Sequence, residues 1–215
     1  MKKLLIMAAM VLSSVGAFAQ HSAGEFTLQP RIGLNVSDVS NVNDSKTRAG
    51  INAGVEAEYY VKNWLGISAG IMYSQQGART EKTGNFDFGD DAKFSGTIKN
   101  TFKFDYINIP ILANFYVAKG LALKTGIQPS FLVNHKLKTE VSSMGASADK
   151  SGTMDGVNSF DFCIPVGISY EYCGFILDAR ANFSLTDTFK NDTKDYDKSS
   201  KNEVLQLTFG YKFSL

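Results

Sequence analysis

Residues 204–215 read VLQLTFGYKFSL, and every second position of this stretch is apolar. Leu205, Leu207, Phe209, Tyr211 and Phe213 alternate with small or polar residues. A period of two residues places neighbouring side chains on opposite faces of a β-strand, whereas a helix repeats every 3.6 residues. The stretch therefore predicts a strand with one apolar face and one polar face.

The same alternation continues through most of the chain, and no segment has a convincing helical period. It predicts seven further strands, at 26–36, 49–61, 65–74, 101–117, 121–133, 159–172 and 175–185. Short turns join some neighbours, at 62–63, 118–120 and 173–174. Long polar segments join the others, at 37–48, 75–100, 134–158 and 186–203. An even number of strands, with short turns at one end and long loops at the other, is typical of a bacterial outer-membrane barrel.

The beginning of the chain predicts export. Lys2 and Lys3 precede an apolar run over 4–15, and Ala17 and Ala19 occupy the positions that signal peptidase reads. The run is shorter than the ~20 residues of a membrane-spanning helix. We expect a secretory signal over 1–19, cleavage after Ala19, and one barrel domain over 20–215. With 22 Lys and Arg against 21 Asp and Glu, the composition gives no sign of nucleic-acid binding.

The two faces of the predicted strands differ in side-chain size as well as polarity. The polar face is rich in glycine, as expected where strands crowd around a narrow lumen: Gly33, Gly50, Gly54, Gly66, Gly70, Gly126, Gly167 and Gly210. Aromatic residues gather near the short-turn end and predict a belt at the membrane surface: Tyr59, Trp64, Phe115, Tyr170, Tyr172, Phe175, Tyr211 and Phe213. We therefore predict an all-β fold, an eight-stranded antiparallel up-and-down transmembrane β-barrel with short periplasmic turns and long extracellular loops.

Charged residues on the polar face then point into the lumen. The predicted set is nearly neutral: Arg31, Glu56, Glu58, Lys103, Asp105, Lys124, Asp161, Glu171, Asp178, Arg180 and Lys212. Unpaired buried charge is costly, so we expect these groups to pair and to fill the lumen.

Some residues do not fit a regular barrel. Pro30, Pro110, Pro129 and Pro165 lie inside predicted strands, although proline cannot donate a ladder hydrogen bond. In the strand at 101–117 the apolar positions change from even to odd numbers. A bulge near 106–110 would account for that change and for Pro110, and it would leave Phe102 and Phe104 facing lipid at the loop end.

The two cysteines, Cys163 and Cys173, lie in one extended stretch and its turn. An extended chain separates them far beyond the ~7 Å that a disulfide tolerates between Cα atoms, so we expect no bridge between them.

Three short motifs resemble those of one known family. YINIPIL at 106–112, TGIQP at 125–129 and DARANFSL at 178–185 resemble consecutive strands of the PorT-like outer-membrane β-barrel family of Bacteroidota. Ala181 stands where the family usually has Tyr, and Ser184 where it has Gly. The resemblance covers essentially the whole mature chain and implies the fold and the location; a few members are linked to type IX secretion.

No residue pattern predicts catalysis, a metal site or a cofactor. His21 falls in the N-terminal tail and His135 in a predicted loop, without a patterned Ser or acid beside either, so we expect both to be solvated. Asp87, Asp90 and Asp91 could attract Ca²⁺, but they lack the EF-hand spacing and fit a solvated acidic loop.

Three functional hypotheses follow. We favour a monomeric barrel, surrounded by outer-membrane lipid, that is structural or binds an extracellular or envelope protein partner through its long loops. The alternatives are a narrow solute channel and a soluble exported lipid-binding barrel, which would reverse the two faces.

Overall fold

The computed structural model describes residues 21–40, 45–87, 93–143, 146–154, 156–189 and 200–215. The predicted signal over 1–19 lies outside these residues. No helix in the described ranges is long and apolar enough to cross a membrane. The strands are β1 Phe26–Val39, β2 Ser45–Lys62, β3 Leu65–Asp87, β4 Lys93–Asn108, β5 Ile111–Ala118, β6 Leu121–Ser143, β7 Ala146–Thr153, β8 Phe160–Tyr172, β9 Phe175–Asp187, β10 Lys201–Tyr211 and β11 Phe213–Ser214.

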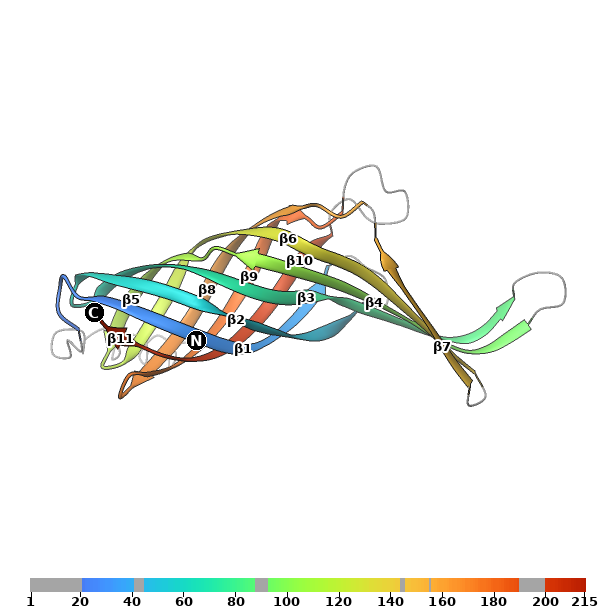
Figure 1. Ribbon diagram of the computed structural model, residues 1–215, viewed down its shortest axis with the longest axis horizontal. Coiled ribbons are helices and arrows are strands. Elements are labelled where there is room, and N and C mark those ends of the chain that lie inside the picture. Colours follow the sequence, from blue (N-terminus) through green and yellow to red (C-terminus); the bar gives the residue numbers. More distant parts are fainter. Residues whose placement is uncertain (1–20, 41–44, 88–92, 144–145, 155, 190–199) are drawn as a thin grey trace, which may run out of the picture.

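The strands close into a ring (Figure 1). Strand β1 pairs with β2 on one side and with β10 and β11 on the other. Strands β4 and β5 share one ring position, because both pair with β3 and with β6. Strand β7 pairs with β6 outside the ring. Eight antiparallel ring positions result, in chain order, which confirms the predicted up-and-down barrel.

The two ends of the barrel differ. Two-residue turns at 63–64, 119–120 and 173–174 lie at one end, where the chain also finishes (Figure 1). At the other end β3, β4, β6 and β7 run on beyond the ring as a twisted pair of hairpins, which we call the extension. Outer-membrane barrels have short turns toward the periplasm, so the extension lies outside the cell.

Much of the extension corrects an expectation. The sequence predicts loops over 75–100 and 134–158, but β3 pairs with β4 as far as Asp87 and Lys93, and β6 pairs with β7 as far as Ser143 and Ala146. Hydrophobic alternation misses these strands because polar residues occupy both of their faces.

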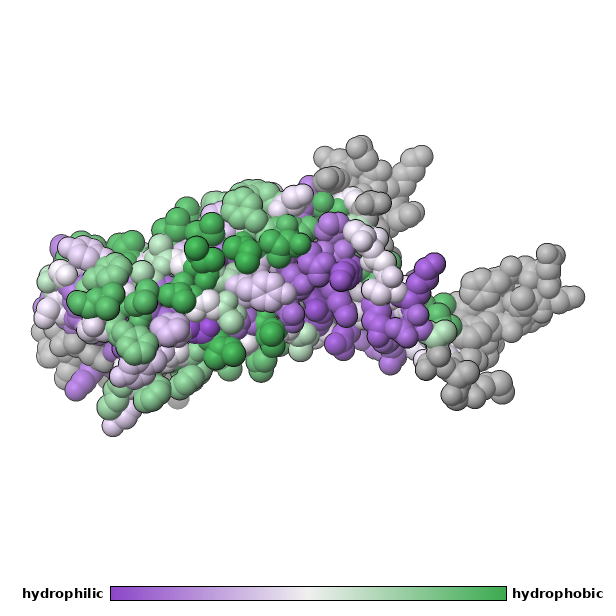
Figure 2. All heavy atoms as spheres, in the orientation of Figure 1, coloured by the Kyte–Doolittle hydropathy of each residue, from purple (hydrophilic) through white to green (hydrophobic). Residues whose placement is uncertain are grey.

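The outer face of the ring is apolar. On β3, Leu65, Ile67, Ala69, Ile71 and Tyr73 face outward over nine residues, close to the 9–11 residues of a tilted membrane-spanning strand. Figure 2 shows the apolar surface in green over the face of the barrel that is in view. Ile71 is 63% exposed, as suits a side chain that faces lipid.

The inner face is crowded. A Cβ atom on Gly33 would lie 2.0 Å from the carbonyl oxygen of Leu207, and one on Gly54 would lie 2.1 Å from that of Ile71. Real side chains cannot approach so closely, and glycine therefore lets the strands curve around a narrow lumen.

Each proline lies where the pairing with one neighbouring strand is interrupted. Pro30 lies between Arg31, which pairs with β10, and Leu28, which pairs with β11. Pro110 separates β4 from β5, and Pro129 faces that same break. The β6–β8 register has a gap opposite Pro165. The missing proline N–H groups therefore fall where the ladder already lacks a bond.

The expected change of facing at 106–110 does not occur. Phe102, Phe104 and Tyr106 are buried inside the barrel, and Leu112 and Asn114 on β5 are buried in the same even-numbered series. The register shift near Tyr106 lies in β6, which has one extra residue there. The inward side chains of β4 become aromatic toward the extracellular end. In the sequence alone, this change looks like a change in which face points inward.

Candidate functional site

The middle of the lumen holds a buried ion-pair network from four strands. Asp178 on β9 forms ion pairs with Arg31 on β1, with Lys124 on β6 and with Arg180, at N–O distances of 2.8, 2.8 and 2.7 Å. Glu56 on β2 pairs with Arg180 at 2.6 Å and with Arg31 at 3.3 Å. These side chains are at most 4% exposed. The network crosses the lumen and ties the strands together.

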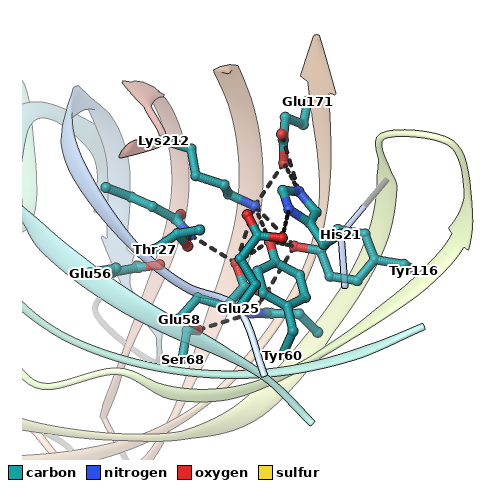
Figure 3. Close-up of polar contacts among 12 residues, drawn as sticks. His21, Glu25, Thr27, Glu56, Glu58, Tyr60, Ser68, Tyr116, Glu171 and Lys212 are labelled. Carbon is teal, nitrogen blue, oxygen red and sulfur yellow. Dashed lines mark hydrogen bonds and ion pairs between the residues drawn. The ribbon is translucent and has the colours of Figure 1, made fainter. Parts of the chain in front are cut away.

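A second cluster fills the periplasmic end of the lumen (Figure 3). The Lys212 Nζ atom lies 2.7 Å from Glu171 and 3.2 Å from Glu58. Glu58 also accepts hydrogen bonds from Asn114 at 2.7 Å and from Tyr116 at 2.8 Å. Lys212, Asn114 and Tyr116 therefore surround the Glu58 carboxylate, which the sequence placed in the lumen.

The segment before β1 completes this cluster. The His21 ring stacks on Tyr60 with 4.2 Å between centroids, and its Nε2 atom lies 3.0 Å from Glu171. Its Nδ1 atom lies 3.1 Å from Glu25, a carboxylate that also accepts from Ser214. His21 is 9% exposed, which corrects the expectation of a solvated tail residue.

Burial lowers the pKa of His21, but the hydrogen bond to Glu171 raises it, and the net shift is upward from 6.5. Lys212 opposes that rise through its charge, whereas Glu25 adds to it. Protonation therefore strengthens the contact between the N-terminal segment and the barrel wall.

The extracellular half of the lumen holds an apolar cluster beside buried polar groups such as Gln76 and Asn202. The cluster consists of Val39, Ala78, Phe102, Phe104, Tyr106, Met154, Val157 and Phe189. Val157 and Phe189 form a β-bridge above the ring, so chain segments from two loops cover the aromatic side chains. His135 lies on β6 opposite Phe104 and is half-buried, not in a solvated loop.

The remaining predicted lumen charges fall into two groups. Asp161 is buried and accepts from Ser184, from Thr186 at 2.6 Å and from the Cys163 thiol at 3.1 Å. Lys103 and Asp105 alternate with the inward residues of β4 and so lie on its outward side, where Asp105 is nonetheless buried and accepts from Asn134 at 2.8 Å. The expectation fails there because the inward positions of this strand are aromatic.

The predicted belt residues all lie on the outer surface toward the short turns. Their exposed fractions run from 37% to 69%. Several of the rings pack against each other, as Trp64 and Phe115 do with 6.4 Å between ring centroids.

The two cysteines are free thiols in different surroundings. Cys163 is buried on β8, and Cys173 is exposed in the turn before β9.

Metal-binding geometry is absent from the described part of the chain, which contains no group of three His, Cys, Asp or Glu side chains that could hold an ion. Asp90 and Asp91 lie outside the described residues.

Comparison with solved structures finds small membrane barrels. The attachment invasion locus protein Ail of Yersinia pestis is 18% identical, with 88% of this chain and 99% of that chain covered and a TM-score of 0.47. Neisserial surface protein A is 15% identical, with 87% and 97% covered and a TM-score of 0.47. OprG of Pseudomonas aeruginosa is 13% identical, with 91% and 99% covered and a TM-score of 0.39.

No curated protein matches the chain. The family described as "Outer membrane protein beta-barrel domain" matches residues 18–190, which is most of the sequence. The closed ring, its apolar outer face and this match agree on a protein of the outer membrane. The chain belongs to the outer membrane protein beta-barrel domain family.

Proposed function

We propose that this protein is a closed, non-enzymatic outer-membrane barrel that acts through its extension, by binding a protein partner at the cell exterior or in the envelope. We also propose cleavage after Ala19, a monomeric barrel and membership of the PorT-like group. The aromatic belt would then lie at the periplasmic surface of the membrane.

The closed lumen is the observation that carries the proposal. Ion pairs block the middle, the cluster around Lys212 blocks the periplasmic end, and the aromatic cluster around Phe104 covers the extracellular end. A water-filled channel needs a continuous open path, and the charges that could line one are paired with each other. The surface left for function is the outside of the barrel and its extension.

The extension is built to persist outside the membrane. Paired strands continue the register of β3 with β4 and of β6 with β7, so the hairpins are held by ladder hydrogen bonds. Figure 1 shows them projecting well beyond the ring. Polar hairpins fixed to a membrane anchor present a stable surface to a partner.

A shortened variant tests this role. Thr80 and Asn100 are directly paired, so an Asn-Gly turn can replace 81–99 without changing the register below. We expect the variant to remain heat-modifiable on gels and to lose the envelope proteins that photo-crosslinkers in the intact extension capture. An identical set of captured proteins would contradict the proposal.

Conductance tests the alternative channel. In planar bilayers we expect the intact protein to give no steady current, with a porin in the same bilayers as the positive control. Single-channel current steps from the purified intact barrel would show that the lumen conducts ions, and they would favour the channel hypothesis.

A further inference from the structure

Basic side chains gather on the outward face where the extension leaves the barrel. They line a groove of about 830 Å³ across β2, β3, β4 and β6, in which six of twelve lining residues are Lys or Arg and two are Glu. We call this the basic groove and define it by its cations: Lys46, Arg48, Arg79, Lys99, Lys103 and Lys138. In Figure 2 the green barrel surface gives way to purple at this level.

The basic groove lies directly above the lipid-facing band. Lys103 is four residues from Ile107 along β4, and Lys136, beside the groove on β6, is three residues from Val133. Val133 is 55% exposed on the outer face. At ~3.3 Å per residue, the cations begin about 10–13 Å beyond these apolar side chains. That is the depth at which lipid headgroups lie.

Some cations of this surface are already paired. Glu81 receives Lys46 at 2.9 Å and Lys99 at 3.6 Å. Lys138 lies 2.7 Å from Glu140 and 3.5 Å from Asp149. Glu81, Glu140 and Asp149 are therefore already paired, and Asp105 is the other carboxylate beside the groove.

Four cations have no such partner. Across the described ranges, Arg48, Arg79, Lys103 and Lys136 form no ion pair, and Arg48 donates to the carbonyl oxygen of Gln76. Asp105 lies two residues from Lys103, but its carboxylate accepts from Asn134 at 2.8 Å. An excess of positive charge therefore remains at the foot of the groove.

Strand register concentrates that excess. Lys103 on β4 is directly opposite Lys136 on β6, a like-charge arrangement that is destabilising unless an anion lies between the two. On its other side Lys103 is opposite Gly77, and the Arg48 guanidinium lies over this glycine, with Nη1 3.4 Å from where a Cβ atom would be. Arg79 follows two residues along β3, so four cations lie close together at the foot of the groove. Such a cluster suits an anion with several oxygen atoms.

We propose that the basic groove and Lys136 bind the phosphate groups of the glycolipid that forms the outer leaflet around the barrel. The guanidinium of Arg79 supplies a planar fork for phosphate oxygens, and Lys103 and Lys136 supply point charges from the two neighbouring strands. Continuity with the lipid-facing band favours a membrane lipid over a soluble anion, since its acyl chains would lie against Ile107 and Val133. This binding does not depend on a protein partner.

Native mass spectrometry of the full mature chain in detergent tests the assignment. The probes are diphosphorylated lipid A, its dephosphorylated form, and a soluble sulfated disaccharide. We expect the protein to retain diphosphorylated lipid A and to release the dephosphorylated form. The triple variant Arg79→Gln, Lys103→Gln, Lys136→Gln should bind about a hundredfold more weakly, because each basic residue near an anionic surface contributes about fivefold.

The matched control removes the same charge elsewhere. Lys82, Lys119 and Lys150 are exposed and outside the groove, so Lys82→Gln, Lys119→Gln, Lys150→Gln should leave lipid A retention unchanged. Heat-modifiable migration shows that both variants fold. Equal retention by the two triple variants, equal retention of the dephosphorylated lipid, or binding of the disaccharide in place of lipid A would each overturn the proposal.

Discussion

The two halves of the lumen are filled by opposite chemistry. Toward the periplasm the wall carries charges that pair across the barrel, with Asp178 fully buried among three cations. Toward the exterior the same ring is filled by aromatic and aliphatic side chains around Phe104. Each half is filled by side chains, but the two halves resist change for different reasons.

The difference shows what each half requires of its residues. A buried charge is tolerated only while its partners are present, so the polar half depends on every member of the network. The apolar half depends on volume, because a truncated ring leaves a cavity that its neighbours fill only partly. Breaking one half at a time should therefore give effects of different size and cause.

The largest effect is expected from Asp178→Asn. Asn keeps the shape but removes the charge that Arg31, Lys124 and Arg180 share, which leaves Lys124 without its carboxylate partner and leaves Glu56 as the carboxylate for both arginines. We expect the free energy of unfolding in urea, measured in lipid vesicles, to fall by about 3–5 kcal/mol.

Asp149→Asn is the control for this variant. Its side chain is 65% exposed and lies 3.5 Å from Lys138, so its loss should change the free energy by less than about 1 kcal/mol. Equal effects at the two positions would mean that the lumen network does not hold the strands together.

A smaller effect is expected from Phe104→Ala. Phe104 is 0% exposed, and its ring packs edge-on against Phe189 with 6.4 Å between centroids. The vacated volume should lower the free energy of unfolding by about 3 kcal/mol.

Phe183→Ala is the control that separates the cost of a cavity from the cost of losing apolar surface. Phe183 is 49% exposed on the outer face, where lipid can fill the space of a missing ring. We expect about half the loss seen at Phe104, since only the transfer from water to lipid is forfeited. A loss as large as that at Phe104 would contradict the packing role of the apolar half.

Local alternation was sufficient to predict the strands of the ring, its short turns and its closure, but not the strands of the extension. It also placed Arg31, Glu56, Lys124, Asp178 and Arg180 on one face, because each lies on a strand whose other face is continuously apolar. Which of them touch was not predictable, since those contacts depend on tilt and register around the whole ring.

The errors share one cause. Sequence reasoning assumed that the lumen is polar throughout, and so it turned Phe102 and Phe104 outward and Lys103 inward. The structure keeps even-numbered residues inside along β4 and β5 and changes the chemistry of the interior. A period-2 pattern shows which residues share a face, but it cannot show which face is inside.

His21 was missed for a different reason. It precedes the first strand, so no periodic pattern includes it, and its contacts with Glu171 and Tyr60 join residues far apart in the sequence. A His and an acid four residues apart, as at His21 and Glu25, was the one local signal, and it is weak by itself.

The smallest effect is expected from the pH dependence of that contact. Because the pKa of His21 is raised above 6.5 in the folded protein, the added stability is fully present below pH 6.5. It is lost as the pH rises through the higher folded value. A hydrogen bond to a charged partner contributes about 1.5 kcal/mol. At pH 6 the free energy of unfolding of the wild type should therefore exceed that of His21→Gln by about this amount.

His135→Gln is the control from the other end of the barrel. His135 lies in the half-buried region opposite Phe104, away from the periplasmic cluster. Urea titrations at pH 6 and pH 9 should show that the free energies of unfolding of wild type and His21→Gln become equal at the higher pH. For His135→Gln, the change in this free energy between pH 6 and pH 9 should equal that of the wild type. A wild-type curve that gains stability from pH 6 to pH 9 relative to His21→Gln would reverse the predicted sign. In that case protonated His21 would not be what holds the N-terminal segment against Glu171.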